Sequence, residues 1–161
     1  MSVTRDIPRA WIKPRAVMAE LLNRGERDDM AFIFLIVACV LVFVAQLPRL
    51  SREAFETGEE FLPLMGGTLM AWVFLAPLMF YALAALSRVV ARLFGGKGTW
   101  YRARLALFWS LLAVSPAMLL HGLTAGFLGP ATPQADIVGA LVLAAFFWIW
   151  LGSLVTAERS T

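Results

Sequence analysis

The sequence predicts an all-α fold, an integral membrane bundle of four transmembrane helices with an N-terminal amphipathic helix. Two observations carry this prediction. First, 60% of the residues are hydrophobic and 16% are charged, whereas soluble domains average about 45–50% apolar and about 25% charged residues. Second, none of the 14 basic and 11 acidic residues lies in four long stretches of the chain. A soluble domain of about this size leaves roughly a third of its unfolded surface exposed, which is too much for such an apolar composition.

The four charge-free stretches are each 18 to 26 residues long. A helix rises about 1.5 Å per residue, so about 20 apolar residues cross a hydrocarbon layer of about 30 Å. We therefore predict membrane helices at about 30–47, 61–86, 105–128 and 137–157, within a transmembrane domain of residues 30–161. The first follows a charged segment and is expected to be a retained helix, with Asp28 or Asp29 as its cap. Pro48–Glu60 and Gly129–Asp136 are expected to be loops.

The segment 1–29 is predicted to be cytoplasmic and amphipathic. Pro14 suits the first turn of a helix, and Gly25 can end it. The apolar positions between them follow helical spacing: Val17, Met18, Leu21 and Leu22. We expect this helix to lie on the inner leaflet with Trp11 at headgroup level. The alternative is a helix that packs on a loop of the bundle itself.

The basic residues predict the orientation of the bundle, because Lys and Arg near helix ends stay cytoplasmic. Twelve of the 14 basic residues precede the first stretch, separate the second from the third, or follow the fourth. The other two, Arg49 and Arg52, lie among four glutamates. Both termini are therefore expected in the cytoplasm. Because topology explains the basic residues, no nucleic-acid partner is expected.

The segment after the second predicted helix has five basic residues and no acidic one: Arg88, Arg92, Lys97, Arg102 and Arg104. Gly95 and Gly96 are expected to end the second helix, and Trp100 marks the interface where the third begins. The five cations are candidates for binding anionic lipid headgroups. The alternative is that they only fix the topology.

Small residues four positions apart let membrane helices approach closely. The helix-packing candidates of this kind are Gly122 with Gly126 and Gly67 with Ala71. Such pairs more often pack the bundle itself than form a dimer. Pro77 and Pro116 are expected to bend the second and third helices, either as fixed kinks or as hinges.

His121 is the only histidine, and it lies within the third predicted helix, whereas the predicted helices contain no Asp, Glu, Lys or Arg. An intramembrane ionisable residue is a functional candidate, but a proton relay needs partners and no acidic residue shares the bilayer. Cys39 is the only other plausible metal ligand, and a metal site normally needs three or more. We therefore predict no metal, cofactor or catalytic residue, and expect His121 to hydrogen-bond a neighbouring helix or hydroxyl. A functional role for it stays open.

The fourth predicted helix is rich in aromatic residues near its cytoplasmic half. These residues are Phe146, Phe147, Trp148 and Trp150. They face either lipid or a larger membrane partner, and they are the partner-docking candidates.

The chain resembles the bacterial branch of the YIP1 family of small polytopic membrane proteins, in particular short alphaproteobacterial members. The segments that carry the resemblance are Trp11-Ile-Lys-Pro14, Leu21-Leu22, Phe43–Glu53, Ala106-Leu-Phe-Trp109 and Ser115-Pro116. The resemblance implies an integral inner-membrane protein with about five membrane helices, one more than the charge-free stretches predict.

The predicted function is that of a non-enzymatic polytopic membrane protein, which scaffolds, organises or assists the assembly of other membrane components. Its expected partners are the lipid bilayer and other integral membrane proteins or further copies of itself. The alternative is a small transporter or channel subunit that uses the bent second and third helices and His121. An intramembrane enzyme is disfavoured, because no nucleophile–base pair and no GxSxG or HExxH motif occurs.

Overall fold

The structure is a computed structural model that describes residues 3–159, and all of its regular elements are helical. Four helices are long and apolar enough to cross a membrane, which confirms the predicted fold class. They are α3 (Asp28–Thr57), the continuous helix formed by α4 (Phe61–Met70), η1 (Ala71–Leu75) and α5 (Ala76–Leu93), then α6 (Trp100–Leu128) and α7 (Pro133–Arg159). The described chain thus has one span fewer than the resemblance implies. Two short helices, α1 (Val3–Ile12) and α2 (Pro14–Leu22), precede the spans.

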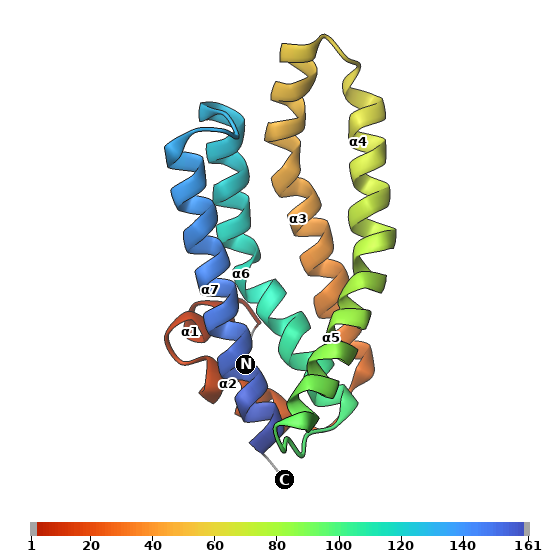
Figure 1. Cartoon of the computed structure of the whole chain (residues 1–161), viewed down its shortest axis with the longest axis vertical. Coiled ribbons are helices and arrows are strands. Elements are labelled where there is room, and N and C mark those ends of the chain that lie inside the picture. The colour runs from red at the N-terminus through yellow and green to blue at the C-terminus, as the bar shows by residue number, and fades with distance from the viewer. Residues whose placement is uncertain (1–2, 160–161) are drawn as a thin grey trace.

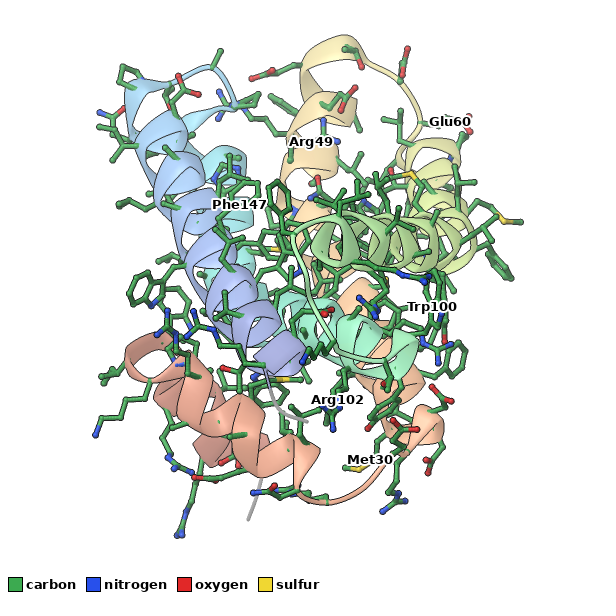
Figure 2. The ribbon with its side chains drawn as sticks, turned by 60° about the horizontal axis from the view of Figure 1, so that its bottom comes forward. Met30, Arg49, Glu60, Trp100, Arg102 and Phe147 are labelled. Atoms are coloured by element: carbon green, nitrogen blue, oxygen red, sulfur yellow. The ribbon has the colours of Figure 1, made fainter. Side chains whose placement is uncertain are left out.

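The spans form two antiparallel hairpins, α3 with α4–η1–α5 and α6 with α7 (Figure 1). The connections at 58–60 and 129–132 lie at one end of the molecule. The connection at 94–99 and the last turn of α7 lie at the other end, and α1 and α2 pack beside that half of α7 (Figure 1). Figure 2 also shows Arg49 and Glu60 toward one end, with Met30 and Arg102 toward the other.

Helix α6 is the centre of the bundle, and every residue from 105 to 115 is buried. It packs against α3, α7 and α5 and also against α1. Its apolar residues run all round the helix, which is typical of a helix that has neighbours on every side. Phe108 contacts Tyr81 of α5 edge-on, and Trp109 contacts Phe34 of α3 at 5.4 Å between ring centroids.

Helix α3 continues past residue 47 to Thr57, so the predicted loop at Pro48–Glu60 is wrong for most of its length. Proline in a helix interior removes one hydrogen bond, but the turns after it are held by ion pairs at i and i+4: Arg49 with Glu53 and Arg52 with Glu56. Arg52 also donates to the carbonyl oxygens of Gly126 and Phe127. These carbonyls belong to the last turn of α6, which has no intrahelical partners for them.

The N-terminal segment forms two helices, of which the sequence predicted only the second. Pro14 opens α2 as expected. The apolar face of α2 is covered by protein, since Val17, Met18 and Leu21 are buried and α2 packs on α7 and α1. The prediction that this face enters the lipid of the inner leaflet is therefore wrong. A covering helix α1 that the periodicity did not reveal accounts for the difference.

Ion pairs hold α1 to α2. The Arg9 guanidinium donates to both carboxylate oxygens of Glu20, at 3.1 and 2.7 Å. This contact lowers the pKa of Glu20 below its ordinary value of 4.5. The buried carboxylate of Asp6 pairs with Arg9 at 3.2 Å and with Arg24 at 3.6 Å. A buried carboxylate with two guanidinium partners fixes how the two short helices meet.

The end of α5 follows the expected residues, whereas the cap of α3 does not. Gly95, at a φ of +84°, follows the end of α5, and the Thr99 hydroxyl accepts from the Arg102 amide to cap α6. In contrast, Arg27 occupies the cap position of α3 without a side-chain bond, and Asp28 and Asp29 lie in its first turn. The prediction of an aspartate cap is wrong, but carboxylates in a first turn still stabilise the positive end of a helix dipole.

Candidate functional site

A cavity of about 310 Å³ lies between α3, η1, α5, α6 and α7, and we call it the His121 cavity. Its polar side chains are Gln46 and His121. The rest of its wall is apolar: Val42, Trp72, Phe80, Leu111, Met118, Gly139, Val142, Leu143 and Phe146. The volume lies at the lower end of the range of about 300–1,000 Å³ that ligand pockets occupy.

The His121 imidazole packs on the backbone of α7. A Cβ added at Gly139 would lie 3.0 Å from its Cε1 atom, closer than ordinary contact, so a larger residue there would require the ring to shift. Nδ1 is buried and has no hydrogen-bond partner among the described residues. The Thr124 hydroxyl donates to the backbone carbonyl of His121 and not to its ring. For Nδ1, the expected hydrogen bond to a neighbouring helix or hydroxyl is therefore wrong.

The bend at Pro77 takes the form of a π-helical turn. Pro77 has no amide hydrogen for the carbonyl of Val73, the usual i−4 partner. The chain responds with the wider register of η1, and the amide of Ala76 bonds the carbonyl of Ala71, five residues back. Such π-bulges are frequent at functional sites, and η1 supplies Trp72 to the wall of the His121 cavity.

At Pro116 the freed carbonyl of α6 belongs to Leu112, and the Ser115 hydroxyl donates to it at 2.8 Å. The next carbonyl, of Ala113, accepts from the Trp11 indole of α1 at 2.9 Å. Two side chains therefore donate hydrogen bonds to backbone carbonyls in this region of α6, one from its own turn and one from the N-terminal segment. Trp11 thus contacts protein backbone, although the sequence suggested a headgroup position for it.

The GxxxG pair lies where α6 crosses α3. A Cβ at Gly122 would collide with the carbonyl oxygen of Ala45, and one at Gly126 would collide with the Cβ of Pro48. The two helices therefore approach to a distance that only glycine allows on the α6 side. Gly126 thus also explains how α3 can pass through Pro48 and stay in contact with α6.

The second small pair, Gly67 with Ala71, has no such neighbour. Both residues are exposed, and a Cβ at Gly67 would meet no atom within 4 Å. The expectation that this pair packs the bundle is wrong. The sequence pattern is the same as at Gly122 and Gly126, but here the small face points away from the other described helices.

The aromatic candidates of α7 divide between two environments. Phe146 stacks on Trp150, with ring centroids 5.7 Å apart, and also lines the His121 cavity. Phe147 and Trp148 are exposed, and Trp148 has 61% of its surface uncovered. Phe146 and Trp150 are half-buried, so Phe147 and Trp148 offer more surface to lipid or a partner, and the docking role stays a prediction for all four.

The five basic candidates, which run from the end of α5 to the start of α6, also divide. The Arg88 guanidinium donates to Glu158 of α7 at 3.2 Å, and the two side chains are only 12% and 9% exposed. Arg104 pairs with Asp28 at 2.8 Å. Arg88 is therefore unavailable to a headgroup, contrary to expectation. The described residues provide no acidic partner for the others, Arg92, Lys97 and Arg102.

Glu158 is the residue that sequence reasoning missed. Its carboxylate accepts from Arg88 and from the Gly98 amide, and its backbone carbonyl accepts from the Lys97 amide. It thereby joins the end of α7 to the connection at 94–99. A lone acid next to a charge-free stretch was the only signal in the sequence, and its partner is 70 residues away.

No group of three or more His, Cys, Asp or Glu that could hold a metal occurs within residues 3–159. The residues that line the His121 cavity include no carboxylate.

The sequence model of the Yip1 domain matches residues 9–157 of the chain. The match covers all of the membrane-span candidates except the last two residues of α7, and most of the N-terminal helical pair. No curated protein and no solved structure matches the chain.

Proposed function

Because the chain belongs to the Yip1 domain family, a family of generally non-enzymatic membrane trafficking proteins, we propose that it is a membrane scaffold. In this proposal it holds other integral membrane proteins, or further copies of itself, against an outward helix face. The face is that of α4 and η1, centred on Gly67 and Ala71, and we call it the Gly67 face.

The proposal rests on one observation: a Cβ at Gly67 would meet no atom of the described residues within 4 Å. At Gly122 and Gly126, the same pattern of small residues brings α6 into backbone contact with α3. In membranes such close contact is a main source of helix association, since lipid removes the hydrophobic drive between helices. A pair with no neighbour among the described residues is therefore suited to a helix from another chain.

The surroundings of the Gly67 face support a helix as its partner. The span that contains it has only 17% of its most apolar window buried inside the protein. Large apolar side chains flank the small residues, and Phe74 and Leu78 are 67% and 69% exposed. These side chains can pack on either side of a helix that approaches Gly67.

The experiment replaces Gly67 by leucine, with Gly66→Leu as the matched control. At either position, an added Cβ would meet no atom of residues 3–159 within 4 Å, so both proteins are expected to fold. Adjacent helical positions point about 100° apart, so only Gly67→Leu blocks the Gly67 face. A photoreactive residue at Phe74 should crosslink a partner in membranes from wild-type and Gly66→Leu cells, and not from Gly67→Leu cells. Equal crosslinking in all three would contradict the proposal.

We place the protein in the inner membrane of a bacterium of the alphaproteobacterial type, with both termini in the cytoplasm. The distribution of Lys and Arg supports this orientation. The end of the bundle with α1, α2 and the last turn of α7 carries twelve of the 14 basic residues. Impermeant labelling of engineered cysteines tests this placement.

A second candidate function, a small transporter or channel subunit, is favoured by the His121 cavity. The cavity lies beside the π-turn at Pro77, and the buried Nδ1 atom has no partner among the described residues. Transporters often bind substrate beside discontinuous helices near the bilayer midplane. In proteoliposomes, a solute flux that His121→Gln abolishes would establish this function, and Gly67→Leu should leave that flux unchanged.

A further inference from the structure

A groove runs between α2 and α7 at the end of the bundle that holds both described chain ends. It consists of two adjoining hollows of about 350 and 450 Å³ that share Arg15 and Val155. Each volume lies within the range of small-molecule pockets. We call the two together the α2–α7 groove.

A close contact between the two helices lies in the wall of the second hollow. A Cβ at Gly152 of α7 would lie 2.9 Å from Cγ of Pro14 and 3.9 Å from Cγ of Arg15, so α2 begins directly against α7. Toward the end of α7, the first hollow is lined by Asn23 and Arg159. Before the contact, the second hollow is lined by apolar and aromatic side chains, which include Ile12, Trp148 and Leu151.

The charges in the groove are unpaired arginines. Arg15 and Arg159 both line the first hollow, both are exposed, and neither forms an ion pair with the described residues. In contrast, nearby Arg9 and Arg24 pair with acids, as does Arg88 on the other side of α7. Two guanidinium groups that have no acidic partner within residues 3–159 make the first hollow attractive to a phosphate, which arginine binds through directed hydrogen bonds.

The expected depth of these residues in the membrane indicates which kind of phosphate compound fits the groove. Arg159 comes two residues after the end of the charge-free stretch 137–157, and Trp148 and Leu151 lie within that stretch. The groove is therefore basic where the membrane surface is expected and apolar toward the hydrocarbon. Trp148 and Leu151 are 61% and 54% exposed, so a chain can lie along them.

We propose that the α2–α7 groove binds one anionic phospholipid. Its phosphate lies between Arg15 and Arg159, and one acyl chain runs over Leu151 and Trp148. The site lies on other elements than the Gly67 face, so its test is independent of the scaffold function. The bound lipid would join the N-terminal helical pair to α7 through contacts that the protein alone does not make.

The experiment measures lipid binding by native mass spectrometry of the full chain, with phosphatidylglycerol as the anionic probe and phosphatidylcholine as the zwitterionic one. Wild type should bind one phosphatidylglycerol in preference to phosphatidylcholine. Each of Arg15→Gln and Arg159→Gln should weaken phosphatidylglycerol binding about fivefold. The matched control is Lys13→Gln, which removes an exposed charge of the same sign that does not line the groove. It should weaken binding less than twofold.

Three results would overturn the proposal. Equal affinity of wild type and the Arg15→Gln/Arg159→Gln double variant would exclude the arginines as ligands. An equal loss in Lys13→Gln would show a general attraction of the basic surface. Displacement of the lipid by millimolar inorganic phosphate would show an anion site without a role for the acyl chain. As a check on that chain, lipid with brominated acyl chains should quench less of the total tryptophan fluorescence in Trp148→Phe than in wild type.

Discussion

Replacing Gly122 by alanine tests the contact between α6 and α3 on which the bundle depends. A Cβ at this position would lie 2.7 Å from the carbonyl carbon of Ala45 and 3.1 Å from its Cα, and closer still to the carbonyl oxygen. The obstructing atoms are backbone, so no side-chain rotation can relieve the contact.

The magnitude of the effect follows from these distances. Ordinary contacts of a Cβ atom lie at 3.4–4 Å, so the helices must separate locally by roughly 1 Å. A gap of about 0.5–1 Å removes a quarter to a half of the dispersion energy of each contact. Overpacking a core by a methyl group costs about 1–3 kcal/mol. Because the clash is with backbone, we expect Gly122→Ala to lower the free energy of unfolding by about 3 kcal/mol, at the upper end of that range.

The assay is unfolding by SDS in mixed micelles, followed by circular dichroism. The matched control is Gly67→Ala, where the added methyl meets no atom within 4 Å. Alanine is the better helix former by about 0.8–1.0 kcal/mol, so this control should be as stable as wild type or slightly more stable. The reasoning is refuted if Gly122→Ala unfolds at the same SDS fraction as Gly67→Ala.

Three further predictions concern the contacts between segments. Glu158→Gln should lower the free energy of unfolding by about 2 kcal/mol, because hydrogen bonds with a charged partner are worth about 1.5–3 kcal/mol. The control is Glu56→Gln, which breaks an exposed ion pair and should change the free energy of unfolding by less than about 1 kcal/mol. Trp11→Phe removes the donor to the Ala113 carbonyl, so it should speed amide exchange in α1 by a factor that corresponds to about 1 kcal/mol, and unchanged exchange would contradict this hydrogen bond. The pKa of Glu20 lies below 4.5 in the folded protein, so its contact with Arg9 should persist at neutral pH and disappear as the pH falls through the lowered pKa. NMR titration should find a higher Glu20 pKa in Arg9→Gln than in wild type, and an equal pKa would disprove the contact.

The spans were predictable from the sequence because hydropathy is a local property. A run of about 20 residues without charge identifies a membrane helix whatever surrounds it. The glycine break after α5 follows from the same local reading, since Gly95 adopts a positive φ there. The extension of α3 through Pro48 was missed, because its support comes from Gly126 and from the bonds of Arg52 to α6.

The candidate sites were less predictable, because the faces of membrane helices carry little pattern. Gly122 and Gly67 open the same small-xxx-small motif, yet one meets a backbone and the other meets no atom within 4 Å. Likewise, Arg88 and Arg92 are one turn apart in a basic segment, and only Arg88 meets an acid, on α7. Which neighbour a residue meets depends on contacts between distant parts of the chain, and a single sequence does not reveal these.

The most direct test of the account is the side of the membrane on which each connection lies. In a Cys39→Ala background, which removes the one native cysteine, single cysteines at Arg5, Glu59, Lys97 and Ala131 are treated with an impermeant maleimide in intact bacterial cells whose outer membrane has been permeabilised. The four-span arrangement predicts labelling of Glu59→Cys and Ala131→Cys in these cells, and of Arg5→Cys and Lys97→Cys only after lysis. Labelling of Arg5→Cys or Lys97→Cys from the same side as Glu59→Cys would contradict it.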